Sequence, residues 1–250
     1  MSSEIKSSET MNSSSLRSLK VVRSKRLYEQ IADQIEALIE AENLLPGSKL
    51  PGERELAEMM GVSRPSIREA LIALETAGYI EFRQGSGNYV RDPASRKTVS
   101  VLRLEDLGPG ALEQFEARRA LEPACAELAG SRATPTQVAG LKASLQRMRQ
   151  LIASGLDPSE EHRTFHSQIA VASGNSIFAA AVRDLWALRQ DAMWDLLKRR
   201  VANDESHRAG LAFREKLILS LERGDSSGAR NAMEEHFERI SKLYFDDVEA

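Results

Sequence analysis

Three histidines in the C-terminal part of the sequence occupy positions that a folded helix would turn inward. His162 and His166 are four residues apart and share a helical face with Phe165. His236 belongs to a second apolar stripe of helical spacing. A buried imidazole without a partner is costly, so several on inward faces indicate a shared polar cavity. Three imidazoles could hold a divalent metal ion such as Zn²⁺, and an i,i+4 pair has suitable geometry for it.

Two arginines fall on apolar stripes in the same way. Arg118 follows Phe115 at helical spacing, with Glu122 one turn further along, and Arg214 follows Leu211. A guanidinium forms paired hydrogen bonds with a carboxylate, so the same cavity could bind an anionic ligand directly. Because three histidines and two arginines on separate helices share this placement, we interpret them as a ligand pocket rather than as unrelated core residues.

The elements expected to position these residues are helices. Residues 93–110, which contain two prolines, are predicted to be a linker, and residues 111–250 a helical domain for ligand sensing and dimerisation. This part of the sequence contains no strand candidate. Glycine-, proline- and asparagine-containing breaks divide it into about six helices, at residues 133–135, 155–158, 174–175, 202–203 and 224–225.

A different pattern precedes the linker. Residues 1–24 are rich in serine and are expected to form a disordered tail. Residues 25–92 contain three short amphipathic segments with Gly61 between the second and third, followed by two β-prone runs, 79–83 and 88–91. Ser63 is the expected N-cap of the third helix. This order of elements predicts a winged helix-turn-helix, so the expected fold class is mainly α with one small β-hairpin.

The third helix of this unit carries residues that suit DNA recognition. Arg64 and Arg68 project from one face near its N-terminus, with Ser66 between them, and we expect all three side chains to be exposed. An arginine in the major groove can bind guanine through two hydrogen bonds. Arg54, at the start of the preceding helix, could reach a flanking phosphate. The turn at Gln84 and Gly85 could approach a groove closely. A solvated helix face is the alternative interpretation of these arginines.

Composition agrees with a soluble globular protein but does not by itself indicate a DNA-binding one. The 250 residues include 34 Lys and Arg against 37 Asp and Glu, a net charge of −3, whereas nucleic-acid-binding domains are usually basic. No apolar run approaches the roughly 20 residues of a membrane helix, and no secretory signal is visible. The single cysteine, Cys125, cannot form an internal disulfide, so we expect a cytoplasmic protein without membrane contact.

The N-terminal unit resembles the DNA-binding domain of the GntR family of transcription regulators. The resemblance lies in PGSKLPGERELAEMMGVSRPSIREALIALE, the preceding LYEQIADQIEALI and the following GYIEFRQGSGNYV. It implies a regulator that binds double-stranded operator DNA as a homodimer. It also implies that the matching residues contact DNA, namely Arg54, Arg64, Ser66, Arg68, Gln84 and Gly85.

The C-terminal helices are similar to the FCD effector domain of the FadR-type subfamily. The matching segments are FEARRALEPACAELAG, FHSQIAVASGN and LERGDSSGARNAMEEHF. The resemblance implies a metal site of one Asp and three His, of which this sequence keeps His166 and His236 and has His162 at the Asp position and Arg214 at the third His position. Two outcomes remain open: His162, His166 and His236 hold a divalent metal, or Arg214 replaces the charge of the metal and binds an anion.

The effector implied by the resemblance is an anionic metabolite. LGPGALEQFEARRALEP, Trp186, Arg189 and Trp194 are similar to the repressors of hexuronate catabolism. This implies a repressor that a sugar acid or another carboxylate releases from DNA, with Arg118, Arg189 and Arg214 contacting the effector. A metal-dependent hydrolase using the three histidines is the enzyme alternative. The sequence has no HExxH, GxSxG or phosphate-loop motif, so we expect no enzymatic activity. A DNA-architectural protein is disfavoured because it needs no ligand pocket.

Overall fold

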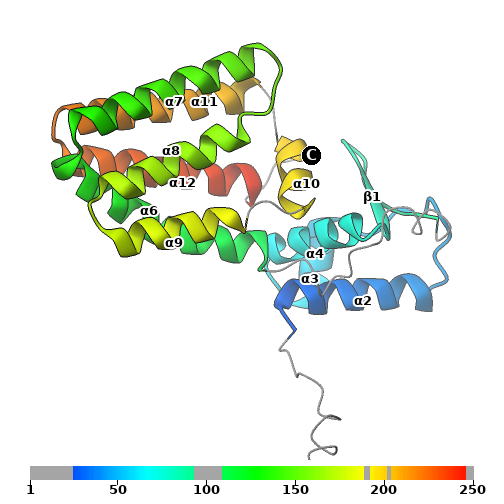
Figure 1. Ribbon diagram of the computed structural model, residues 1–250. Coiled ribbons are helices and arrows are strands. Elements are labelled where there is room, and N and C mark those ends of the chain that lie inside the picture. Colours follow the sequence, from blue (N-terminus) through cyan, green and yellow to red (C-terminus); the bar gives the residue numbers. More distant parts are fainter. Residues whose placement is uncertain (1–24, 93–108, 189–191, 202–203, 246–250) are drawn as a thin grey trace, which may run out of the picture.

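The chain forms a small N-terminal unit and a larger helical bundle, with one helix lying between them (Figure 1). The computed structural model describes residues 25–92, 109–188, 192–201 and 204–245. The predicted tail, residues 1–24, and nearly all of the predicted linker lie outside the described residues. The observed elements confirm the fold class, since helices make up the described chain apart from one antiparallel hairpin.

The N-terminal unit has the order helix, helix, helix, hairpin of a winged helix-turn-helix. It contains α2 (Leu27–Ala41), α3 (Glu53–Met60), α4 (Arg64–Thr76), β1 (Ile80–Arg83) and β2 (Gly87–Val90). The two strands pair antiparallel from Ile80 opposite Val90 to Arg83 opposite Gly87. Each strand lies within one residue of its predicted bounds. An isolated bridge between Lys49 and Tyr89, which the sequence did not indicate, extends the hairpin.

Local sequence signals explain where α3 ends and α4 begins. Gly61 ends α3 in the left-handed conformation, with φ of 65°, which glycine adopts without strain. The Ser63 hydroxyl then caps α4 by accepting the Ser66 N–H at 3.3 Å, and Pro65 fits in the first turn because its missing N–H is not needed there. Ile67 and Leu71 are fully buried against the rest of the unit. These features give α4 a fixed start and a fixed inward face.

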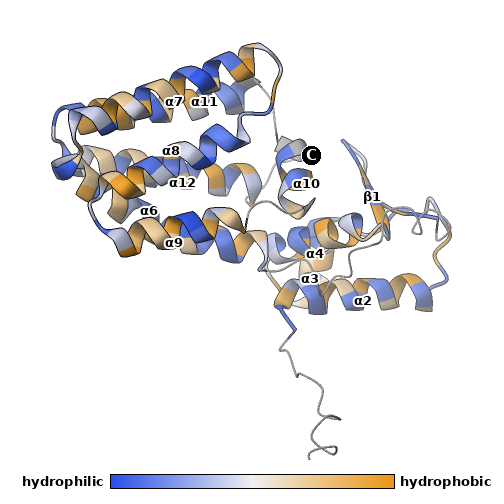
Figure 2. Ribbon diagram, in the orientation of Figure 1, coloured by the Kyte–Doolittle hydropathy of each residue, from blue (hydrophilic) through white to orange (hydrophobic). Residues whose placement is uncertain are grey.

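The larger unit consists of helices packed through their apolar faces (Figure 2). Its described helices are α6 (Ala111–Arg132), α7 (Pro135–Ala153), α8 (Ser159–Ala172), α9 (Ser176–Ala187), α10 (Ala192–Val201), α11 (Asp204–Glu222) and α12 (Ser226–Tyr244). Helix α6 runs along α12, and the rings of Phe115 and Phe237 pack with their centroids 5.6 Å apart. The single helix predicted between residues 176 and 201 is two helices, α9 and α10.

Helix α10 of the larger unit lies at the contact between the two units. It packs against α4 of the winged helix-turn-helix and against α12 of the bundle. Trp194 on α10 is almost fully buried, and its indole N–H donates to Oε1 of Gln114 on α6 at 2.7 Å. The position of α10 therefore depends on both units. Among the described helices, none has the length and apolarity that crossing a membrane requires.

Candidate ligand pocket and DNA-reading residues

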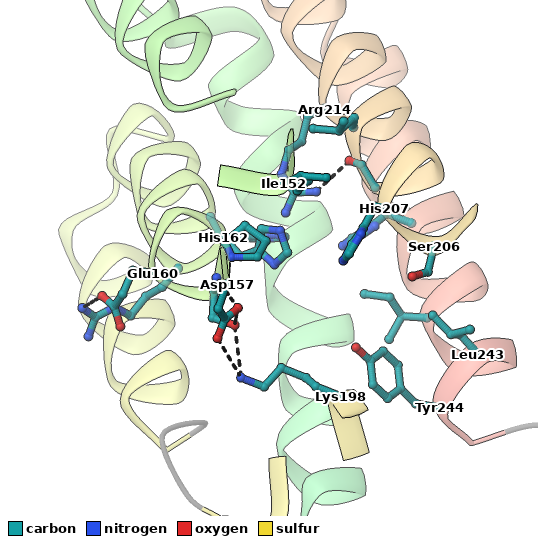
Figure 3. Close-up of a pocket in the computed structure, with 18 of the residues that line it drawn as sticks. Ile152, Asp157, Glu160, His162, Lys198, Ser206, His207, Arg214, Leu243 and Tyr244 are labelled. Atoms are coloured by element: carbon teal, nitrogen blue, oxygen red, sulfur yellow. Dashed lines mark hydrogen bonds and ion pairs between the residues drawn. The ribbon is translucent and has the colours of Figure 1, made fainter. Parts of the chain in front are cut away.

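A cavity of about 650 Å³ opens within the helical bundle. Side chains from α6, α8, α10, α11 and α12 line it, and Figure 3 shows His162, His207, Lys198 and Tyr244 arranged around it. The predicted residues Arg118, His162, His166, Arg214 and His236 all contribute to the lining. The fold thus brings together five of the six pocket residues predicted from the sequence. The sixth, Arg189, lies outside the described residues.

Glu122 organises the deepest part of this site. Its Oε1 accepts hydrogen bonds from Nε of Arg118 at 2.7 Å and from the indole N–H of Trp186 at 3.0 Å. Its Oε2 contacts Nδ1 of His166. The Arg118 guanidinium also lies over the Trp186 ring, 3.9 Å from its centroid. Arg118, Glu122 and His166 are at most 2% exposed, so these contacts form in an interior of low polarity.

The charge states of this network follow from its contacts. Burial alone would raise the pKa of Glu122, but the adjacent Arg118 and His166 lower it to about 2. Burial lowers the pKa of His166 to about 4, against the opposing effect of Glu122. At neutral pH, Glu122 is therefore ionised and His166 is neutral. Donation from Nδ1 of His166 to Glu122 leaves its Nε2 as an acceptor on the cavity side.

The second arginine, Arg214, is buried with fewer contacts that could offset its positive charge. Arg214 is 3% exposed, and its Nη1 donates to the carbonyl of Gly210 at 2.7 Å. Its guanidinium carbon lies 5.2 Å from the ring centroid of Phe165 and 5.4 Å from that of Phe213. Burial, with Arg239 and Arg118 nearby, lowers the pKa of Arg214 to about 9. Arg214 is thus a buried cation whose surroundings are mainly apolar or positively charged.

Two donors of these arginines lack a partner. Within the described residues, Nη2 of Arg118 and Nε of Arg214 are buried and have no hydrogen-bond acceptor. Of the charged side chains buried at this end of the cavity, two are guanidiniums and one, Glu122, is a carboxylate that Arg118 and His166 already engage. A buried guanidinium N–H group without a hydrogen-bond acceptor destabilises the folded protein. The arrangement is therefore suited to receive an anion with oxygen acceptors.

The three histidines do not form a metal site with these surroundings. The described residues contain no group of three His, Cys, Asp or Glu side chains that could hold a metal ion. The His236 ring stacks on Phe213 at 3.8 Å, and Nδ1 of His166 is engaged by Glu122. Burial, together with Arg214 and other nearby groups, keeps the pKa of His236 well below its usual value. The donor set does not fit a bound cation, because Arg214 already places positive charge there.

The mouth of the cavity contains polar residues that the sequence did not single out. Nζ of Lys198 on α10 lies 2.8 Å from Asp195 and 3.9 Å from Asp157, which precedes α8 (Figure 3). Arg239 and Tyr244 of α12 also line the cavity. The i,i+4 spacing of Arg118 and Glu122 was a visible signal for their ion pair. No local pattern marked the residues of the mouth, because they come from separate helices.

The predicted DNA-contacting residues fall into two groups. Arg54, Gln84 and Gly85 are exposed, and Gly85 takes a φ of 68° in the hairpin turn. Ser66, in contrast, is 6% exposed, and its hydroxyl lies 2.8 Å from that of Ser63. Arg64 and Arg68 are half-buried. The exposure expected for these three α4 residues is wrong for this arrangement: the Ser66 hydroxyl faces that of Ser63, and Nη1 of Arg68 donates to the carbonyl of Tyr244 on α12.

Comparison with known proteins matches both units. The family model for bacterial regulatory proteins of the gntR family matches residues 27–90, and that of the FCD domain matches residues 113–239. Three similar proteins come from Escherichia coli. The Uxu operon transcriptional regulator is 33% identical over 90% of each chain. The Exu regulon transcriptional regulator is 31% identical over 92% of this chain and 89% of its own. The putative L-lactate dehydrogenase operon regulatory protein is 32% identical over 92% of each chain.

These proteins are described as regulators rather than enzymes, and the matches leave neither unit of the described chain unassigned. The winged helix-turn-helix and the helical bundle correspond to the two matched domains in the same order. The chain belongs to the gntR family of bacterial regulatory proteins, in the FadR-like group that carries an FCD effector domain.

Proposed function

We propose that this regulator is a cytoplasmic, homodimeric repressor that an anionic sugar acid, of the hexuronate type, releases from its operator. The dimer would place two winged helices on half-sites about one helical turn apart. Arg54, Arg64, Ser66, Arg68, Gln84 and Gly85 would contact the DNA. Arg118 and Arg214 would bind the carboxylate of the effector, and Arg189 would contribute to the same site.

The observation that carries this proposal is the pair of unmet guanidinium donors. Nη2 of Arg118 and Nε of Arg214 are buried beside the cavity, and within the described residues neither has an acceptor. A carboxylate can accept from both arginines and offset the excess positive charge. Neutral His166 would then be available to accept a hydrogen bond from a hydroxyl group. Binding of the anion is favourable because it supplies acceptors and negative charge to two buried guanidiniums that otherwise lack them.

The remainder of the cavity favours a polyhydroxylated acid over a smaller carboxylate. Its volume of about 650 Å³ lies within the range of small-molecule pockets, roughly 300–1,000 Å³, and greatly exceeds what lactate would fill. Away from the arginines the lining includes hydroxyl, ammonium and carboxylate groups, among them Ser159, Ser206, Lys198 and Asp157. Such groups can pair with several sugar hydroxyls. The two relatives that regulate the Uxu operon and the Exu regulon support the same class of effector.

We further propose that Arg214 replaces a metal ion. The resemblance to FCD domains implies a ligand at this position, but a guanidinium cannot coordinate a cation. Its charge lies where the metal charge would be and could bind the effector anion directly. A divalent ion such as Zn²⁺ on His162, His166 and His236 would require that an anion bridge it to Arg214.

A thermal-shift screen tests the effector proposal. D-Glucuronate, D-galacturonate, D-gluconate and L-lactate would each be added to the purified protein with and without a chelator. We expect a hexuronate to raise the melting temperature, since a ligand that binds the folded state stabilises it, and we expect chelator to leave this shift unchanged. A shift with lactate alone would assign a small carboxylate instead. No shift with any of the four acids would refute the proposed class.

A further inference from the structure

Two consecutive residues of α4 contact the effector domain. Nη1 of Arg68 donates to the main-chain carbonyl of Tyr244, at the end of α12, at 3.0 Å. Oε1 of Glu69 accepts the main-chain N–H of Leu112, in the first turn of α6, at 2.9 Å. The Glu69 carboxylate thus lies at the positive end of the α6 dipole, where a negative charge is stabilising. The predicted recognition helix therefore contacts the beginning of one effector-domain helix, α6, and the end of another, α12.

The contact of Glu69 depends on a close approach at Gly110. A Cβ atom at residue 110 would overlap the Glu69 carboxylate, whereas the backbone of Gly110, with φ of −64°, is accessible to any residue. Glycine at this position thus matters for the room it leaves to the carboxylate in its observed place, not for conformational freedom. Glu69 is also buried, with 9% exposure. The buried carboxylate of Glu69 therefore occupies the space that the missing side chain of Gly110 leaves.

The helices that hold α4 are also helices that line the ligand cavity. Arg118, whose guanidinium faces the cavity, follows Leu112 by less than two turns on α6. Tyr244 itself lines the cavity, together with His236 and Arg239 on the same helix. Helices α6 and α12 pack along each other. A change in their relative position on ligand binding would therefore act on both contacts of α4.

These contacts occupy part of the surface that would read DNA. Arg68 pairs with Glu53 through Nε and Nη2, at 2.9 Å and 2.6 Å, while its Nη1 donates to Tyr244. Its side chain is 11% exposed, and the neighbouring Ser66 is buried. In contrast, Arg54 and the hairpin turn remain exposed. The contacts of Arg68 and Glu69 therefore cover part of α4, whereas Arg54 and the hairpin turn stay accessible.

We propose that Arg68 and Glu69 form an interdomain latch that holds the recognition helix against the effector domain, so that the arrangement described here is the one released from DNA. The latch consists of the contacts from Arg68 to Tyr244 and from Glu69 to Leu112, with Gly110 providing the space. Operator binding opens it, and an effector that binds the cavity favours its closure. This inference rests on the proposed DNA-reading role of α4.

Binding measurements on Glu69→Ala test the latch. The probe is a duplex selected from a random-sequence library with the wild-type protein. Because the variant loses one closing contact, we expect it to bind this duplex about fivefold more tightly than wild type does, within the usual range of coupling between sites. Glu69→Gln, which keeps the size and the acceptor, should keep the contact and bind the duplex no more tightly than wild type does. Glu127→Gln, which lies further along α6 and pairs with Arg230 at the surface, is the matched control and should leave affinity unchanged.

Gly110→Ala provides a second route to the same contact. The added methyl group should displace the Glu69 carboxylate and tighten duplex binding, as Glu69→Ala does. In the Glu69→Ala background the carboxylate is absent, so Gly110→Ala should have no further effect. Additive effects of the two substitutions would overturn the latch.

Amide hydrogen exchange provides a structural readout that does not depend on the effector. The Leu112 amide should exchange faster when the selected duplex is bound, since Glu69 then leaves it. Unchanged exchange at Leu112 on duplex binding, or unchanged duplex affinity of Glu69→Ala, would refute the proposal. Failure of the library to yield any duplex would instead refute the proposed DNA-binding function.

Discussion

Nε of Arg118 donates a hydrogen bond of 2.7 Å to Oε1 of Glu122, and neither side chain is more than 2% exposed. The same carboxylate also holds His166 and Trp186. Glu122 therefore fixes the orientation of the groups that face the cavity, while it neutralises one of two buried guanidiniums. The hydrogen bonds of Glu122 hold the deepest side chains of the site in place, and the cavity they face has more positive than negative charge. These two properties suit the recognition of an anion.

Glu122→Gln should strongly destabilise the protein. The substitution leaves Arg118 and Arg214 buried without a compensating charge, and breaking a buried ion pair in this way costs about 3–5 kcal/mol. Glu127→Gln on the same helix breaks only the exposed pair with Arg230 and should leave the free energy of unfolding nearly unchanged, because solvent screens such a pair. Urea unfolding measures both. Equal losses for the two variants would show that the Glu122 network contributes nothing beyond a surface ion pair.

Arg214→His should create a zinc site that the wild-type protein lacks. The substitution removes the buried guanidinium charge and adds an imidazole near His166 and His236. We expect about one equivalent of zinc per chain in the variant, removable by chelator with a fall in melting temperature. Arg214→Lys, which retains the charge, is the control and should bind none. Stoichiometric zinc in the purified wild-type protein would show that Arg214 has not replaced the metal.

The sequence contained enough local information to predict most of the fold. Gly61, Ser63 and Pro65 mark the boundary between α3 and α4 through backbone conformation and capping, which depend on adjacent residues only. The division between α9 and α10 was not predicted, because residues 176–201 contain no glycine or proline to mark it.

The candidate site was predictable in its members but not in its contacts. Arg118, His166, Arg214 and His236 were visible as polar residues on apolar stripes. Which of them would find a partner depends on helices far apart in the chain, so the unmet donors of the two arginines could not be inferred. The burial of Arg68 was missed for the same reason, since its partner Tyr244 is 176 residues away.

Two arginines of the winged helix-turn-helix should differ in how their loss affects DNA binding. Arg64→Ala, in the N-terminal turn of α4, should cost roughly 1–3 kcal/mol on the selected duplex and relax the preference at one base position. Arg54→Ala should weaken binding to selected and random duplexes alike and reduce the salt dependence by about one phosphate contact. Fluorescence anisotropy at several salt concentrations measures both effects. An equal loss on random DNA for Arg64→Ala would assign it to the phosphate backbone.

Duplex affinity should fall as the pH is lowered from 8 to 6, through protonation of Glu69. Burial, with Glu113 and Glu116 of α6 nearby, raises the pKa of Glu69 to about 7, although the N–H groups of Leu112 and Ala111 oppose the shift. Tyr28 of α2 also faces it, and the phenol is neutral in this range because burial raises its pKa further above neutrality. When the latch opens, the pKa of Glu69 returns to its ordinary value near 4.5.

The sign of the effect follows from proton uptake. Between pH 4.5 and 7 the closed latch binds more protons than the open one, so lowering the pH favours closure, and raising the pH above 7 removes this advantage. The ratio of closed to open protein should rise about tenfold from pH 8 to pH 6. Glu69→Gln, which cannot titrate, should lose this part of the pH dependence, whereas Glu127→Gln should retain it. If Glu69→Gln shows the same fall in affinity as wild type, another group is responsible.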